Sequence, residues 1–197
     1  MALTTYCCHA LAEAIGFVCA TMSAKGFKVD GVIINRNDVD FASITMHATY
    51  NNVMTNLPLA AGALGYAVSQ PSVDPYKGSK VELVQGTYAN TFTKTLHLVI
   101  LMADHADGNI ADKLACGEFV VVLRKKAANG ATEYIVYGLD TGLKASEITQ
   151  DYYSDDTNGG VEVTLVEEGA PVFGRYLDAG SESATETLLT AMITPSP

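Results

Sequence analysis

The clearest alternation of apolar and polar residues runs from residue 88 to residue 101. One set of alternate positions is Phe92, Lys94, Leu96, Leu98 and Ile100, and the other is Thr91, Thr93, Thr95, His97 and Val99. Because successive side chains of a strand point to opposite faces, this period of two predicts a strand with one packed and one hydroxyl-rich face. The run 80–85, which precedes Gly86, predicts the first strand of a hairpin with it.

The next segments continue this pattern. Residues 109–116 predict a short helix that begins at an Asn109 cap and ends before Gly117. Residues 119–124 are almost continuously apolar, which favours a strand covered on both faces. The Asn129-Gly130 pair predicts a hairpin turn into a strand at 133–139. A last strand pair is expected at 143–150 and 161–166, joined by the polar loop 151–160.

The first half of the chain is less regular. Residues 1–26 fit either an apolar helix or buried strands, whereas 29–35, 44–50 and 66–70 predict strands. The stretch 58–78 otherwise reads as a long loop, and loops of about 20 residues in a compact domain are usually functional. We therefore expect it to contact neighbouring subunits. Its marker residues are Gly62, Gly65, Pro71, Pro75 and Gly78.

These elements predict a mainly β (α+β) fold: a β-sandwich or partly closed antiparallel barrel with one short flanking helix, plus loop and terminal arms. Residues 1–178 form the expected single domain and residues 179–197 a C-terminal arm, either helical or flexible. A helix there would begin near Ser183 and Glu186. The arm is expected to reach a neighbouring subunit through Leu188, Leu189 and Met192.

Composition narrows the class of protein. The chain has 197 residues, is 48% hydrophobic and 17% charged, and carries a net charge of −10, which suits a globular domain rather than a disordered one. An acidic surface repels phosphate, so recognition of nucleic acid through a basic footprint is not expected. DNA could still pass along such a surface without adhering to it.

Cysteines and the N-terminal region point to synthesis in a reducing cytoplasm. Cys7, Cys8, Cys19 and Cys116 form no CxxC or metal-ligand spacing and are expected to be reduced and mostly buried. The apolar stretch 10–24 lacks a basic leading segment and contains Glu13, so neither a signal peptide nor a membrane span is expected.

No motif in the sequence indicates catalysis or a cofactor. Nucleophile elbows, phosphate loops and zinc-binding helices are absent, and the four histidines are isolated in sequence. Oxygen ligands could bind calcium in the loop after residue 150, although their spacing is not that of an EF-hand and a solvated loop explains them more simply. Those weak metal candidates are Asp151, Asp155, Asp156 and Asn158.

Residues 92–166, with their order of strand, helix, strand and hairpin, resemble the tail tube proteins of long-tailed bacteriophages, and in particular structural proteins of phages of Bacteroides-type bacteria. The residues that carry the likeness are Leu3-Thr4-Thr5, the strand at 91–101, the helix at 110–114, the segment Tyr137-Gly138-Leu139-Asp140-Thr141-Gly142-Leu143 and the alternating strand 160–165. The likeness covers about half of the chain and carries no catalytic residues.

The resemblance implies a non-enzymatic virion protein whose copies form stacked hexameric rings around a DNA channel. Its partners would be itself and other phage structural proteins, with double-stranded DNA passing through and no membrane involved. Residues 80–101 are expected to border the channel, with Thr91, Thr93, Thr95 and His97 on the exposed face. A head–tail connector or capsid decoration protein remains open, as does a small calcium- or glycan-binding β-domain.

Overall fold

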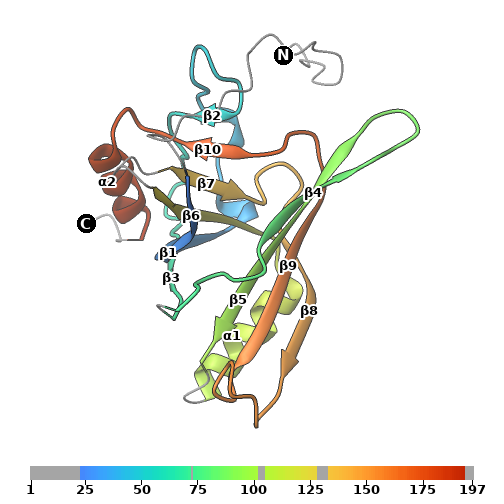
Figure 1. Ribbon diagram of the computed structural model, residues 1–197. Coiled ribbons are helices and arrows are strands. Elements are labelled where there is room, and N and C mark those ends of the chain that lie inside the picture. The colour runs from blue at the N-terminus through green and yellow to red at the C-terminus, as the bar shows by residue number, and fades with distance from the viewer. Residues whose placement is uncertain (1–22, 72, 102–104, 128–132, 194–197) are drawn as a thin grey trace.

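Figure 1 shows the computed structural model of the chain, which describes residues 23–71, 73–101, 105–127 and 133–193. Strands hold 44% of these residues and helices 18%, so the fold is mainly β. The strands form a six-stranded and a four-stranded sheet, and neither closes into a barrel. The class predicted from the sequence is confirmed as a sandwich-like arrangement of two open sheets.

The six-stranded sheet has the order β2-β10-β7-β6-β1-β3, and its pairs are antiparallel apart from the parallel pair β2–β10. Its strands are β1 (Ser23–Asn35), β2 (Val53–Met54), β3 (Tyr66–Ser69), β6 (Phe119–Ala127), β7 (Tyr134–Tyr137) and β10 (Arg175–Leu177). The expected pairing of β6 with β7 is confirmed, while the turn at 129–130 and the ambiguous residues 1–22 lie outside the described residues.

The four-stranded sheet has the order β4-β5-β9-β8 and is antiparallel throughout. Its strands are β4 (Lys80–Val84), β5 (Thr91–Ile100), β8 (Lys144–Gln150) and β9 (Val161–Ala170). Both pairs predicted from the sequence, β4 with β5 and β8 with β9, are present. β5 begins at Thr91 rather than at residue 88, which leaves residues 85–90 as the tip of the hairpin.

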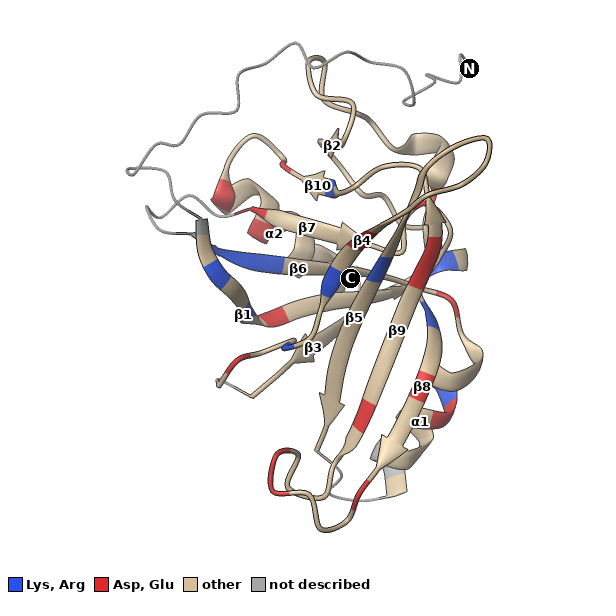
Figure 2. Cartoon of the chain, turned by 45° about the vertical axis from the view of Figure 1, so that its right-hand side comes forward, with Lys and Arg blue, Asp and Glu red and all other residues tan. Residues whose placement is uncertain are grey.

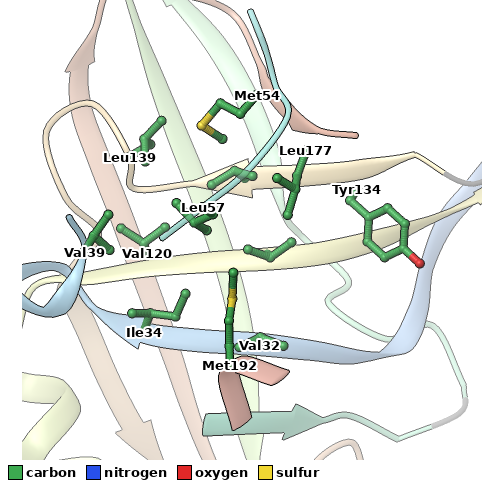
Figure 3. Close-up of a cluster of buried hydrophobic side chains, with 12 residues drawn as sticks. Val32, Ile34, Val39, Met54, Leu57, Val120, Tyr134, Leu139, Leu177 and Met192 are labelled. Carbon is green, nitrogen blue, oxygen red and sulfur yellow. The ribbon is translucent and has the colours of Figure 1, made fainter. Parts of the chain in front are cut away.

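β6 separates two hydrophobic cores, as its continuous apolar run predicted. Val120 and Val122 point into a core formed with β1, the segment 39–59 and the C-terminal helix (Figure 3). Val121 and Leu123 point into the other core, between the two sheets. The molecule is therefore layered, with the four-stranded sheet, the six-stranded sheet and a helix-and-loop layer stacked in that order.

Two α-helices complete the fold: α1 (His105–Cys116) and α2 (Glu182–Ile193). α1 packs Leu114 into the core between the sheets. It begins four residues earlier than expected, so Asn109 lies within the helix and is not its cap. Cys116 at its end is exposed, which corrects the expectation of burial for this cysteine; the other three lie outside the described residues.

α2 belongs to the body of the molecule. Its cap is Ser181, whose Oγ accepts the N–H of Ala184 at 3.1 Å, and not Ser183 as the sequence suggested. Met192 is buried in the core next to β6, with Leu188 and Leu189 packed against that core. Of the two forms that the sequence left open for this segment, the helix is the one observed, and it docks on its own chain as a third layer.

The prediction of a strand at residues 44–50 is wrong. A 3-10 helix at Phe41–Ser43 precedes the segment, which forms only an isolated bridge from Met46 to Met54. Two backbone hydrogen bonds flank this bridge, from the His47 N–H to the Val53 carbonyl and from the Thr55 N–H to the Thr45 carbonyl. The Thr45 N–H donates to the side-chain oxygen of Asn56 at 2.7 Å instead of to a neighbouring strand. A side chain therefore takes a backbone bond that a longer ladder would have made, and the pairing does not extend into a strand.

Candidate assembly surface and buried charge cluster

The four-stranded sheet ends in β4 and β8, which within the described residues each pair on one side only. Backbone N–H groups alternate in direction along a strand. On the β4 side of β5, His97 donates its N–H to Ser79 Oγ at 3.1 Å and Val99 donates to Gln70 Oε1 at 2.8 Å. Odd-numbered residues of β5 therefore face β4. By the same alternation, the backbone groups of β4 that point out of the sheet are those of Val81 and Leu83.

The alternation also identifies the open groups of β8. The β9 residues that face β8 are Glu162, Thr164 and Val166, which are paired with Thr149, Glu147 and Lys144 respectively. Ala145 and Ile148 consequently direct their N–H and C=O groups away from the sheet. No hydrogen bond from another described residue reaches these two residues, but directly before the strand both backbone groups of Leu143 are bonded to Phe119 at 2.9 Å, and α1 packs against β8, so this edge is open only in part. Open backbone edges of this kind bind further strands.

The β4–β5 hairpin carries apolar side chains away from both cores. Leu83 is 53% exposed, Val84 45% and Tyr88 100%. Figure 1 shows this ribbon projecting beyond the rest of the molecule, with its tip at residues 85–90. Its base is held by an edge-on contact of Phe92 with Phe173, whose ring centres lie 5.8 Å apart. Exposed apolar residues gathered on a projecting element are typical of a contact with another molecule.

The candidate channel residues lie on the face of the four-stranded sheet that points away from the cores. Thr91 and Thr93 are half-buried, while Thr95 is buried. His97 is half covered as well, because the chain at Gly78 lies against its ring and Thr164 Oγ1 lies 3.3 Å from its Nδ1. The hydroxyl-rich character predicted for this face is present, but its lower part is partly covered by the chain itself.

Charged residues are few on this outward face, and most are acidic. Four glutamates and two lysines occupy it, giving a net charge of −2: Glu82, Glu147, Glu162, Glu168, Lys80 and Lys144. Figure 2 shows that further acidic residues gather in the loop between β8 and β9. No Phe, Tyr or Trp side chain lies on this face of the four strands, and the ring of His97 is half covered by the chain at Gly78. A net negative charge on this face repels a phosphate backbone.

Behind the sheet lies a buried cluster of four charges. Lys94 on β5 is 1% exposed, and its Nζ lies 3.0 Å from Glu167 Oε2 and 3.4 Å from Asp140 Oδ2. Glu167 on β9 is fully buried. Arg175 on β10 donates to Asp140 through Nη2 at 2.7 Å and Nε at 3.1 Å. Two cations and two anions make the cluster neutral, which is the condition under which charges can be buried.

Glu167 also holds the turn between β7 and β8. Its carboxylate accepts the N–H groups of Gly138 at 2.9 Å, Asp140 at 2.9 Å and Thr141 at 3.1 Å. Gly138 has a φ of +78°, and a Cβ there would lie 2.1 Å from the Phe119 carbonyl oxygen, so only glycine fits. The cluster thus joins the two sheets at the end where β8 begins.

The five marker residues of the predicted contact loop, residues 58–78, differ in their exposure. Gly65 and Pro75 are buried in this chain, and the Gly65 N–H donates to the Met192 carbonyl at 2.9 Å, so neither is a surface for a neighbour. Gly62, Pro71 and Gly78 are exposed, and their assembly role stays a prediction. Met192 is buried in the core, which corrects the expectation that it reaches another subunit, whereas Leu188 and Leu189 are half-buried against the same core and their assembly role stays a prediction.

The weak metal candidates are not brought together. Among the described residues there is no group of three or more His, Cys, Asp or Glu side chains that could hold a metal ion. Asp151 Oδ1 instead accepts the Tyr153 N–H at 3.0 Å, and Asn158 has a positive φ of 50°, both of which are turn features. In the same part of the chain, no helix has the length and apolar character needed to cross a membrane.

Sequence reasoning missed the charge cluster. Lys94 did give a signal, as the one charged residue in the apolar row of β5. Asp140, Glu167 and Arg175 gave none, because they come from a turn and two other strands that only the tertiary structure brings together. Comparison of this chain with family models, curated proteins and solved structures returned no match.

Proposed function

We propose that this chain is a virion structural subunit, the tail tube protein of a long-tailed bacteriophage, which assembles head to tail with copies of itself. The observation that carries the proposal is that β4 pairs only with β5 and leaves its outer edge open, while the outer edge of β8 on the opposite side of the sheet is open only in part. Two different complementary patches on one subunit produce rings or helical filaments rather than closed dimers. The phage assignment itself comes from the sequence resemblance of residues 92–166.

The strand number supports closure into a ring. Direction alternates through β4, β5, β9 and β8, so β4 and β8 run antiparallel to each other. If copies are related by rotation about an axis roughly along the strands, the next copy's β4 keeps the direction of the first. It would then lie antiparallel to β8, and the alternation would continue without interruption from one subunit to the next.

The outward face of the four-stranded sheet is suited to line the channel of such a ring. Its hydroxyl groups and its charge of −2 would let DNA move without adhering, because phosphates are repelled rather than bound. The projecting tip at 85–90 would lie at one end of the channel. It is placed to contact the next ring through Tyr88, which is fully exposed.

The proposal is tested by sedimentation velocity over a range of concentrations. Wild type should form large assemblies that grow with concentration. Leu83→Pro removes an N–H that points out of the open edge, and proline is tolerated at such positions, so it should fold but assemble poorly. Leu83→Thr keeps the N–H and is the control that should still assemble. A wild type that stays monomeric contradicts the proposal, and growth that stops at one ring favours a connector.

A further inference from the structure

We propose that the tip of the β4–β5 hairpin of one copy, residues 85–90, binds the β8–β9 loop, residues 151–160, of a second copy in the next ring. The inference rests on the proposed function and names the surface that the tip contacts. Three observations carry it: the two segments lie at opposite ends of one sheet, both expose tyrosines, and their polar groups are complementary.

The tip and the loop lie at opposite ends of the four-stranded sheet. At the tip end, Thr91 of β5 is paired with Val84 of β4. At the other end, Ile100 of β5 is paired with Val161, which is also paired with Gln150 at the start of the loop. Figure 1 shows the tip and the loop extending beyond the sheet in opposite directions. When copies repeat head to tail along the strands, the tip of each therefore approaches the loop of the next.

The strand order adds a sideways displacement to this repeat. The tip joins β4 to β5 and the loop joins β8 to β9, so in the order β4-β5-β9-β8 they lie two strands apart. Neighbouring strands are about 4.8 Å apart, which makes the displacement about 10 Å. With the ring axis roughly along the strands, contact between tip and loop rotates each ring relative to the previous one, as in a helical stack.

The three most exposed tyrosines of the described residues belong to these two segments. Tyr88 at the tip is 100% exposed, and in the loop Tyr153 is 95% and Tyr152 is 76% exposed. Tyrosine is enriched at the energetically important positions of protein interfaces, because its ring covers a large apolar area while its hydroxyl forms hydrogen bonds. Each copy therefore has a tyrosine to insert at one end and tyrosines to receive it at the other.

The loop holds its tyrosines outward in a fixed shape. The Ser154 N–H donates to the Asp151 carbonyl at 3.2 Å, and the Ser154 carbonyl accepts the Gly159 N–H at 3.2 Å. Thr157 is only 4% exposed and anchors the loop on the rest of the chain. A surface whose shape is fixed before binding loses less conformational entropy when its partner binds.

The loop carries negative charge and the tip carries none. Three aspartates and no basic residue lie in the loop (Figure 2), whereas residues 85–90 contain no charged side chain. Within the described residues, no hydrogen bond or ion pair engages the carboxylates of Asp155 and Asp156. The hydroxyl of Tyr88 and the side-chain amide of Asn90 are donors for such acceptors. The tip can therefore approach the loop without repulsion and donate hydrogen bonds to it.

Truncation of the tip tyrosine tests the contact. Tyr88→Ser should need about tenfold more protein than wild type to form filaments, because buried interface tyrosines carry a large share of the binding energy. Tyr66→Ser is the matched control: Tyr66 lies on β3 of the other sheet, is 58% exposed, and its truncation should leave filament formation unchanged. Sedimentation velocity over a range of concentrations measures all three proteins.

Charges placed on the tip should act with opposite sign. Thr87→Lys brings a cation to the acidic loop and should lower the protein concentration needed for filaments several-fold, whereas Thr87→Glu should raise it, and high salt should reduce both effects. Asp155→Asn with Asp156→Asn should remove most of the gain from Thr87→Lys, because the two sites are coupled only if they meet. Thr187→Lys and Thr187→Glu make the same changes of net charge on α2, and the difference between them should be much smaller.

Cysteine pairs give a readout that does not depend on charge. Tyr88→Cys with Tyr153→Cys should cross-link filaments into ladders of covalently joined chains, since the two positions meet in the proposed contact. Tyr88→Cys with Tyr66→Cys is the control pair and should not, and each single variant controls for the native cysteines.

Filament formation by Tyr88→Ser at the wild-type concentration, Thr87 variants that shift assembly in the same direction, or cross-linking of the control pair instead of the proposed pair would each overturn the inference while leaving the proposed function in place. A wild type that never assembles would overturn both.

Discussion

Lys94 and Glu167 carry full charges in positions with almost no contact with water, so their mutual contact decides whether they stabilise the fold. Lys94→Met leaves the Glu167 carboxylate without its ammonium partner, and Glu167→Gln leaves the ammonium with only the more distant Asp140. Each single substitution should lower the free energy of unfolding by about 3–5 kcal/mol, because it strands a buried charge.

The double variant, Lys94→Met with Glu167→Gln, distinguishes a lost ion pair from lost packing. It buries no unpaired charge at these positions, so its loss of stability should be well below the sum of the two single losses. Urea unfolding at neutral pH measures all three. Strictly additive losses would show that Lys94 and Glu167 do not act as a pair.

Tyr137 gives a prediction about alkaline pH. Burial, with a smaller contribution from Tyr176, raises the pKa of its hydroxyl from 10.0 to about 12. Below pH 10 the group is neutral in both the folded and the unfolded chain. As the pH rises toward 12, only the unfolded chain ionises, so stability should fall by up to about 1.4 kcal/mol for each pH unit. Tyr137→Phe should remove this share of the loss, measured by urea unfolding from neutral to alkaline pH, and an unchanged slope would contradict the assignment.

At the scale of elements, periodicity predicted the strands whose environment is simple. β6 has a core on each face and reads as a continuous apolar run, and β5 has one core face and reads as an alternation. The sequence predicted the boundaries less accurately where the end of an element depends on particular side chains. α2 begins at a Ser181 cap and the segment near Thr45 is held by Asn56, and such contacts leave no periodic signal.

In the candidate assembly surface, too, some features followed from periodicity and others depended on tertiary structure. The outward row of Thr91, Thr93, Thr95 and His97 followed from alternation alone. The open edges did not, because strand order in a sheet is a property of long-range pairing: β9 lies between β5 and β8 although 60 residues separate Ile100 from Val161 along the chain.

The docking of α2 is tested by Met192→Ala. Met192 is 7% exposed and packs with Val32 and Val122 in the core next to β6. Its truncation should lower the free energy of unfolding by about 2–4 kcal/mol through lost burial and a new cavity. Thr187→Ala, on the exposed side of the same helix, should change it by no more than about 0.5 kcal/mol. Thermal unfolding of both variants measures the difference, and equal effects would mean that α2 does not depend on this contact.

At the scale of the whole molecule, the fold separates stability from association. The six-stranded sheet has a core on each face, and the buried charges anchor β8 and β9 to it. The four-stranded sheet has a core on one face only and keeps the open edge of β4, the partly open edge of β8 and a projecting hairpin. A monomer would expose these edges to uncontrolled pairing, whereas a polymer of identical copies covers them in one defined way.

Negative-stain electron microscopy of the purified wild-type chain is the most direct test of whether this protein assembles into a tube. If the chain is a tail tube subunit, we expect hollow filaments built from stacked rings, because each subunit would contact its neighbours in the ring through the edges of the four-stranded sheet and the next ring through its hairpin tip. Particles that remain single subunits at high protein concentration would contradict it.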